Sequence, residues 1–302
     1  MNILFVILSY NRPKVLQECL RSLYENTKIK PTLSYILDDC SEDWMKQALL
    51  DAAIKRTKAG TPINVLINNK NLGVGHQFQT AYSLIRQHRP DIACVIESDY
   101  IWRNEWLEDV VAVFEASPHT VAIAGMDHAD MYQRHKTHGE FCKLMIEQQG
   151  KDIEARPFLY QPFNLETSRG PIEVFGVSNS CGCQILHWGR ICQFFFENLR
   201  MEGAYWRGMD RGFHTDLDRS RASDAHMSGT HTSLWEVYAK KQGIDMTKHF
   251  GFLNILPSLS YHSANQGING KLDPRFFPEG GECFAGVNSG TFPKDYNNWT
   301  RQ

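Results

Sequence analysis

The sequence lacks any long hydrophobic run. Its longest purely apolar stretch is Ile3 to Leu8, whereas a helix that crosses a bilayer needs about 20 residues. A secretory signal is also missing, because the polar run SYNRP follows that stretch directly, without a basic start or a small-residue cleavage site. We therefore expect no transmembrane segment, and we interpret Met1 as the start of a cytoplasmic chain.

An excess of charge of one sign is absent as well. The 302 residues include 32 Lys plus Arg against 34 Asp plus Glu, which gives a formal net charge of -2. Such a balance creates no strong global field toward polyanions or membranes, so a dedicated polyanion-coating protein is excluded. With 42% apolar residues, the chain is long enough to build one or two packed domains.

Strong zinc signatures are missing from the eight cysteines. Cys19 falls in a helical pattern and Cys94 in a strand-like run, where a free thiol behaves as a small buried apolar group. Two further clusters lack the C-x2-C pairs of a structural zinc site: Cys181, Cys183 and Cys192, and His135, His138 and Cys142. We expect reduced, buried thiols and a solvated His-rich loop rather than bound zinc.

The first half of the chain alternates strand and helix patterns. Strands are predicted at 2–9, 32–37, 63–67, 92–96 and 120–125, and helices at 13–23, 43–54, 76–87 and 105–115. The first strand is continuously apolar, which is typical of a strand covered on both faces, and Pro13 suits a first helical residue. This order predicts an α/β fold with a mostly parallel sheet and helices on both faces.

The alternation stops after Met126. Residues 127–171 are polar and aperiodic, which is typical of a long excursion or a lid. Beyond them the pattern predicts a strand at 171–177, a helix at 187–199, a loop at 203–232, and a helix at 233–242 closed by Gly243. The last fifty residues are rich in Gly, Asn and Pro and predict a tail that wraps the surface.

Four polar clusters follow the predicted parallel strands. They are SYN at 9–11, DDCSED at 38–43, NKNLGVG at 69–75 and ESD at 97–99. In open parallel sheets, ligands bind beyond the carboxyl ends of the strands. The clusters therefore predict a ligand site at that edge of the sheet.

These clusters carry a resemblance to a known family. The runs SYNRPKVLQECLRSLYENT, ILDDCSED, NNKNLGVGHQFQTA and VIESDYIWRNEWLEDV resemble the successive blocks of family two glycosyltransferases, over about residues 2–126. The resemblance implies the GT-A fold, with a Rossmann-like sheet, and a nucleotide-sugar donor. It divides one continuous domain into a nucleotide-sugar-binding part at 1–126 and an irregular, acceptor-binding part at 127–302.

A carboxylate at a strand end can accept the N–H of a uracil ring, and Asp39 fits this role. The resemblance implies that further residues line the nucleoside pocket: Ser9, Tyr10 and Asn11, with Asn71 and Gly73 close to the base or ribose. Asp38, Asp39 and Asn11 have a simpler interpretation as caps of turns and helices.

The diphosphate needs a counter-ion, because the chain has no GxxxxGK[ST] loop. A divalent Mn²⁺ or Mg²⁺ ion is the natural choice. The resemblance implies Asp99 as a metal ligand, with Glu97 and Ser98 in contact with the donor. His262 resembles the late histidine that closes over the metal in many enzymes of this fold.

The base that takes the proton of the acceptor hydroxyl has several candidates. An inverting transfer is expected to use a carboxylate or imidazole, and Asp216 or Asp218 in TDLDRSR fits one register. Another register places Thr230 and His231 where the family has an acidic pair, and Asp224 lies between the two. A retaining mechanism would need no such base.

The acceptor is expected to be a saccharide or another hydroxyl compound. Residues 187–222 combine aromatic and Arg side chains, which can stack on sugars or bases and hold phosphates. A hydroxymethylated base in DNA is a less favoured acceptor. The run of three Phe residues at 194–196 is best explained as part of a core helix rather than as a ligand contact. Two rival classes are a nucleotidyltransferase, although SYNRPK is not its Gly-rich phosphate loop, and a noncatalytic sugar-binding module.

Overall fold

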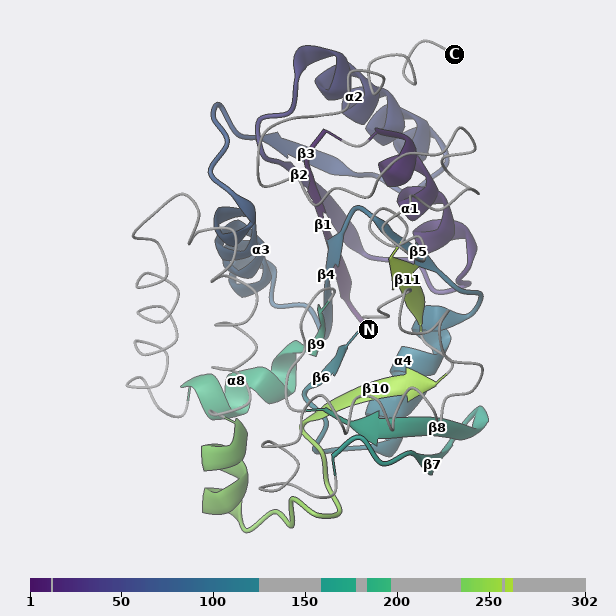
Figure 1. The fold of residues 1–302 in the computed structure, drawn as a ribbon, viewed down its shortest axis with the longest axis vertical. Coiled ribbons are helices and arrows are strands. Elements are labelled where there is room, and N and C mark those ends of the chain that lie inside the picture. The colour runs from purple at the N-terminus through teal and green to yellow at the C-terminus, as the bar shows by residue number, and fades with distance from the viewer. Residues whose placement is uncertain (12, 125–158, 178–183, 197–234, 257–258, 263–302) are drawn as a thin grey trace, which may run out of the picture.

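A computed structural model describes residues 1–11, 13–124, 159–177, 184–196, 235–256 and 259–262 (Figure 1). Within these residues, a nine-stranded sheet has the order β3-β2-β1-β4-β9-β6-β10-β8-β7. Its strands are β1 Ile3–Ser9, β2 Leu33–Asp38, β3 Asn64–Ile67, β4 Ile92–Glu97, β6 Ala122–Ala124, β7 Phe163–Thr167, β8 Gly170–Gly176, β9 Gln184–His187 and β10 Phe252–Leu256. A second sheet pairs β5 Tyr100–Trp102 with β11 Ser260–His262.

The strand directions confirm a mostly parallel α/β sheet. Strands β3, β2, β1 and β4 are parallel to one another. Strand β9 lies antiparallel between β4 and β6, β10 is parallel to β6, and β8 lies antiparallel between β10 and β7. Only β9 and β8 therefore run against the common direction of the sheet.

Helices cover both faces of this sheet (Figure 1). They are α1 Pro13–Glu25, α2 Asp43–Lys58, α3 Val74–His88, α4 Trp106–Ala116 and α8 Trp188–Phe196, with a further helix at 235–242. Alternate residues of the fully buried strand β1 pack into two clusters. Phe5 joins the cluster of α1, α2 and α4, and Val6 joins the cluster of α3 and α8. This double burial explains the continuous apolar run of β1.

The predicted elements of the first half are confirmed, with shifts of a few residues at their ends. The second half differs more. Strands β5, β7, β9 and β10 were not predicted, and β10 is wholly buried between β6 and β8. The expectation that the last fifty residues form only a surface tail is therefore wrong for the part that contributes β10 and β11, because a buried edge of β6 needs a strand partner.

Two local predictions are confirmed. Gly243 has a left-handed φ of 66° and closes the helix at 235–242, where its N–H donates to the Lys240 carbonyl and the Ile244 N–H donates to the Ala239 carbonyl. Cys19 and Cys94 are buried free thiols, and burial raises the pKa of both. Apart from Cys192, a free thiol, the residues of the two possible zinc clusters lie outside the described ranges.

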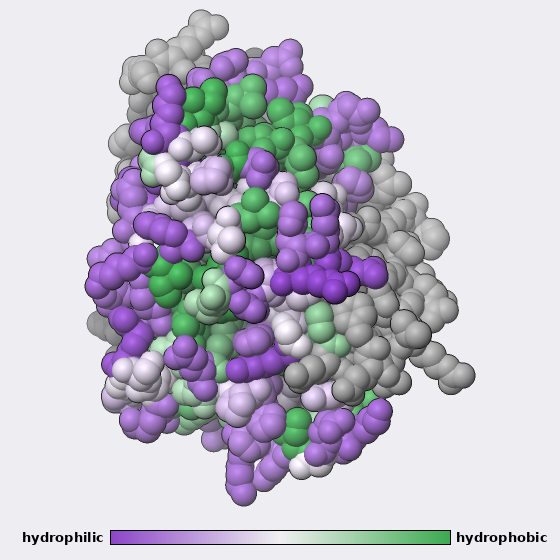
Figure 2. Space-filling view, turned by 180° about the vertical axis from the view of Figure 1, so that it is seen from behind, coloured by the Kyte–Doolittle hydropathy of each residue, from purple (hydrophilic) through white to green (hydrophobic). Residues whose placement is uncertain are grey.

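Exposed apolar side chains lie on β3, the outermost described strand on one side of the sheet, and on α2. Leu66 and Ile67 of β3 are exposed, as are Leu50 and Ile54 of α2. Figure 2 shows apolar side chains gathered in its upper part, at the end of the molecule where Figure 1 places α2 and β3. No helix in the described part of the chain is long and apolar enough to cross a membrane.

Candidate functional site

The carboxyl ends of the neighbouring strands β1, β2 and β4 lie side by side; we call this end of the sheet its carboxyl edge. The register pairs Ser9 with Asp38 and Leu8 with Glu97. The backbone N–H of Asn68 donates to the Asp38 carbonyl at 2.9 Å, which adds the segment after β3. The structure therefore brings the four predicted polar clusters side by side.

Asn11 ties the turn after β1 to the start of α2. Its backbone N–H donates to Ser41 Oγ, and its Oδ1 accepts the Glu42 N–H, both at 2.9 Å. Asn11 is buried and has a φ of 48°, in the left-handed region that Asn tolerates better than most residues. The capping interpretation of Asn11 is thus confirmed, and a direct contact with the nucleoside stays a prediction.

Asp38 caps the turn after β2. Its carboxylate accepts the backbone N–H of Ser41 at 2.9 Å and also the Ser41 hydroxyl. The side chain is fully buried, and this burial raises the pKa of the carboxyl even though the bonds from Ser41 act in the opposite direction. The contacts of Asp38 are those of a turn cap.

Asp39 holds the loop that precedes α3. Its Oδ1 accepts bonds from Asn68 Nδ2 at 3.0 Å and the Leu72 N–H at 2.9 Å, and its Oδ2 accepts the Gly73 N–H at 2.7 Å. Only 3% of the residue is exposed. A carboxylate offers about four acceptor positions, so one more donor can be accommodated. The loop contacts add a structural role to Asp39, and its recognition of a base stays a prediction.

The loop that Asp39 holds ends in a turn with a left-handed glycine. Gly73 has a φ of 83°, which favours glycine, and it directly precedes the first residue of α3. The Oδ1 of Asn71 also accepts the Gly73 N–H, at 3.1 Å, while the Asn71 side chain is exposed. Asn71 and Gly73 therefore lie at the site, at the N-terminus of a helix where anionic groups are favoured.

Two further predicted residues follow β1. Ser9 is buried, and its Oγ has no hydrogen-bond partner among the residues that the structure describes. Tyr10 is half-buried at the start of the turn. A buried hydroxyl without a partner is costly unless a ligand or water satisfies it, so Ser9 suits a polar ligand at this edge.

Asp99 lies in the polar turn that follows β4. The backbone N–H of Ser98 donates to the Leu8 carbonyl at 3.0 Å, which holds the turn after Glu97 against β1. Ser98 and Asp99 are buried, with 5% of Asp99 exposed. The antiparallel pair β5–β11 places His262 opposite Tyr100, next to Asp99 in the chain. The topology therefore brings the two predicted metal ligands to neighbouring positions.

These residues fit a divalent metal. A carboxylate is a hard oxygen donor that suits Mg²⁺ or Mn²⁺, and an imidazole favours Mn²⁺ of the two. The described residues contain no group of three His, Cys, Asp or Glu side chains that could hold an ion by themselves. A site of this kind takes its remaining ligands from substrate phosphates and water, as Mg²⁺ sites commonly do.

Sequence reasoning missed Gln77, which lies in the first turns of α3. Its side-chain amide donates to the carbonyls of Ser9 and Leu37, and only 5% of the residue is exposed. The available signal was a polar residue on the buried stripe that continues through Ala81 and Ile85. The partners of Gln77 are backbone groups, which leave no mark in a sequence.

Arg190 was expected among the residues that could hold an acceptor phosphate. Its guanidinium instead donates to the carbonyls of Phe114, Ser117 and Thr120 at 2.6–2.7 Å, so it caps the end of α4. Burial lowers the pKa of Arg190. The candidate bases Asp216, Asp224 and His231, together with Asp218 and Thr230, lie outside the described residues.

Comparison with solved structures finds partial matches. A mannosyltransferase, PcManGT from Pyrobaculum calidifontis in complex with GDP-Man and Mn²⁺, is 16% identical, and the match covers 41% of this chain and 34% of that chain with a TM-score of 0.35. TarS 1–349 of S. aureus in complex with UDP is 22% identical, with 41% and 35% covered and a TM-score of 0.34. The matched part thus spans about a third of each of these structures.

No curated protein matches the chain. A family model described as "Glycosyl transferase family 2" matches residues 4–174. The matched range runs from the second residue of β1 into β8 and includes all the polar strand ends described above, except for the contribution of β11. Because this range is more than half of the 302 residues, the chain belongs to glycosyl transferase family 2.

Proposed function

We propose that the chain transfers a sugar from a nucleoside-diphosphate sugar to a hydroxyl acceptor. The observation that carries this proposal is the meeting of the polar ends of β1, β2 and β4 with the Gly73 turn at the start of α3. Open α/β sheets bind their ligands beyond the carboxyl ends of the strands, and the polar groups gathered here suit a nucleoside, a diphosphate and a metal. Family membership supports transfer over the rival nucleotidyltransferase and sugar-binding functions.

The nucleoside part of the site would lie between β1 and β2. The remaining acceptor position of Asp39 suits the N–H of a uracil ring, and the Ser9 hydroxyl, which has no hydrogen-bond partner within the described ranges, is available for a further polar group. Tyr10, Asn11 and Asn71 would border the base and ribose. We therefore name UDP-sugars as the first donors to test.

The diphosphate part of the site would lie beside Asp99. Asp99 and His262 would hold Mn²⁺ or Mg²⁺, while Glu97 and Ser98 contact the donor. A bound metal ion supplies Lewis-acid stabilisation of the negative charge on the departing diphosphate. The buried setting of Asp99 excludes most water from the carboxylate, which strengthens its electrostatic interactions.

The acceptor would enter from the part of the chain at 127–302. We propose an inverting transfer to a saccharide hydroxyl, with Asp216, Asp224 or His231 as the group that takes the proton. A hydroxymethylated base in DNA is the second acceptor class. Retention on a DNA column that falls steeply with added salt would favour it.

A donor panel tests the proposed function. Purified protein is incubated with UDP-, GDP-, TDP- and CMP-sugars with and without Mn²⁺, and release of the nucleotide is measured. We expect release from at least one diphosphate sugar, dependent on metal and lost in Asp99→Asn. The matched control is Asp245→Asn, because Asp245 is a partly exposed acid whose partners are Thr247 and Lys248. Equal release by both variants would contradict the proposal.

A further inference from the structure

Gln77 joins the ends of two neighbouring strands through one nitrogen atom. Its Nε2 donates to the carbonyl oxygen of Ser9 at 3.0 Å and to that of Leu37 at 2.8 Å. Ser9 is the last residue of β1, and Leu37 is the penultimate residue of β2. The primary amide has two N–H bonds, so both are used and both carbonyls are satisfied in a buried place.

The two joined carbonyls support the predicted nucleoside half of the site. The Ser9 carbonyl also accepts the Asp39 N–H at 3.1 Å, so the Gln77 contact reaches the turn that carries Asp39. Residues in the left-handed region flank the joined strand ends, with φ values of 48° at Asn11 and 61° at Cys40. Such conformations cost free energy and persist where surrounding contacts fix them.

We infer that Gln77 is a positioning residue that fixes the spacing of the β1 and β2 ends and so the shape of the nucleoside pocket. This inference rests on the proposed function. Gln77 acts through backbone groups, so it is not a catalytic residue. Its amide cannot be replaced by an apolar side chain or by a carboxylate, because neither donates two hydrogen bonds.

The test compares three variants by calorimetric titration of UDP with Mn²⁺. Gln77→Leu removes both donors, and we expect UDP to bind about tenfold more weakly. The matched control is Thr120→Val. Thr120 precedes β6, at the amino ends of the parallel strands and so far from the carboxyl ends that form the site, and its buried hydroxyl donates to the Phe250 carbonyl. The control should keep the original affinity. Stoichiometry separates the two effects, because unfolding lowers the number of sites while mispositioning lowers the affinity of each site.

Gln77→Glu adds a readout that general destabilisation would not produce. The introduced carboxylate would face two carbonyl oxygens, so burial and missing donors would raise its pKa. When protonated, the group regains one donor. Relative to the unaltered chain, the affinity of this variant should therefore recover between about pH 8 and about pH 6, while that of Gln77→Leu should not.

Each failure has its own signature. If the unaltered chain binds UDP and Gln77→Leu binds it equally well, the inference is overturned and the proposed function stands. If the unaltered chain binds no nucleotide, the proposed function fails, and hydrogen exchange of the Asp39 N–H decides the positioning claim. Gln77→Leu should then speed that exchange and Thr120→Val should not, and unchanged exchange in Gln77→Leu would overturn the inference.

Discussion

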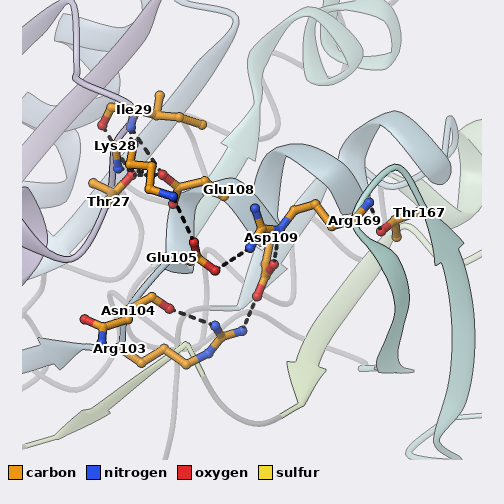
Figure 3. A network of polar contacts seen from close by, with 10 residues as sticks. All are labelled: Thr27, Lys28, Ile29, Arg103, Asn104, Glu105, Glu108, Asp109, Thr167 and Arg169. Atoms are coloured by element: carbon orange, nitrogen blue, oxygen red, sulfur yellow. Dashed lines mark hydrogen bonds and ion pairs between the residues drawn. The ribbon is translucent and has the colours of Figure 1, made fainter.

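Two groups of acidic side chains differ in how the protein satisfies them. Asp38 and Asp39, at the carboxyl edge of the sheet, accept hydrogen bonds from neutral groups. Glu105 and Asp109, at the start of α4, pair with Arg169, and Asp109 also pairs with Arg103 (Figure 3). The first pair is buried, whereas the second is partly exposed.

The paired acids fasten one part of the fold to another. Arg169 lies in the turn between β7 and β8 and reaches Glu105 at 2.7 Å and Asp109 at 2.8 Å (Figure 3). Lys28 reaches Glu105 from the other side, at 3.3 Å. The bond from Arg169 and that from Lys28 lower the pKa of Glu105, whereas burial raises the pKa of Asp38.

The contrast separates structural acids from candidate functional ones. An acid that is matched by the protein's own cations contributes to the fold and leaves little charge for a ligand. Among the described residues, Asp39 accepts hydrogen bonds from neutral donors rather than from cations, so its carboxylate can still interact with a ligand at the site. The predictions below test this contrast, beginning with the largest expected effect.

Asp99→Asn should abolish most activity. Loss of a metal-holding carboxylate costs several kcal/mol of transition-state stabilisation, so we expect the turnover of a donor sugar to fall by at least about a hundredfold. Steady-state kinetics over a range of Mn²⁺ concentrations measures this effect. Turnover within about threefold of the original value would place the metal elsewhere.

His262→Ala should weaken metal binding rather than remove it. Loss of a residue that only supports a metal ligand typically lowers metal affinity about tenfold or more, and loss of a ligand should cost at least as much. We therefore expect the Mn²⁺ concentration that gives half-maximal activity to rise about tenfold. High Mn²⁺ should restore much of the turnover. An unchanged Mn²⁺ requirement would remove His262 from the site.

Two substitutions of Asn11 separate its backbone from its side chain. Asn11→Gly keeps the left-handed φ and loses the hydrogen bond that Asn11 Oδ1 accepts from the Glu42 N–H, at a cost of about 1 kcal/mol in the free energy of unfolding. Asn11→Ala loses both and should cost about 2 kcal/mol. Urea unfolding of the two variants measures the difference, and equal stability would show that the left-handed turn relaxes without cost.

Asp38→Asn tests the direction in which burial shifts the pKa of the Asp38 carboxyl. Because the folded pKa of Asp38 lies above its ordinary value of 3.8, its contribution to stability is present at low pH and lost as the pH rises through the folded value. Asparagine does not titrate, so the variant should become more stable relative to the unaltered chain as the pH rises above the ordinary carboxyl value of 3.8. At pH 7 the two should differ by less than about 1 kcal/mol. If Asp38→Asn instead became less stable relative to the unaltered chain as the pH rises, the raised pKa of Asp38 would be refuted.

Arg169→Gln should have the smallest effect. Partly exposed ion pairs contribute little, so we expect the melting temperature to fall by about 2 °C in dilute buffer and by less in concentrated salt. Donor turnover should be unchanged, because Arg169 lies outside the polar strand ends. A loss of activity without a loss of stability would move this network into the functional site.

Local sequence pattern predicted the first half of the fold and less of the second. Strands β1 to β4 are separated by helices with regular apolar spacing, so each element could be recognised within its own segment. Strands β9 and β10 are short, and their places beside β6 depend on pairing with segments distant in the chain. No local period encodes such pairing.

The candidate site was predictable where the strand-end rule applies. That rule selects Asp38, Asp39 and Asp99 from their positions after apolar runs. It does not distinguish the capping role of Asp38 from the loop contacts of Asp39, because both depend on the conformation of neighbouring backbone. Gln77 escaped prediction for the same reason.

The most direct test of the central claim is a calorimetric titration of UDP into the purified chain, with and without Mn²⁺, beside the same titration of Asp99→Ala. If the carboxyl edge of the sheet binds a nucleoside diphosphate with a metal ion, binding will be of micromolar strength, on the order of −8 kcal/mol, and will require both Mn²⁺ and Asp99. Binding that is indifferent to Asp99 and Mn²⁺, or no binding of UDP and of GDP, TDP and CMP in turn, would contradict it.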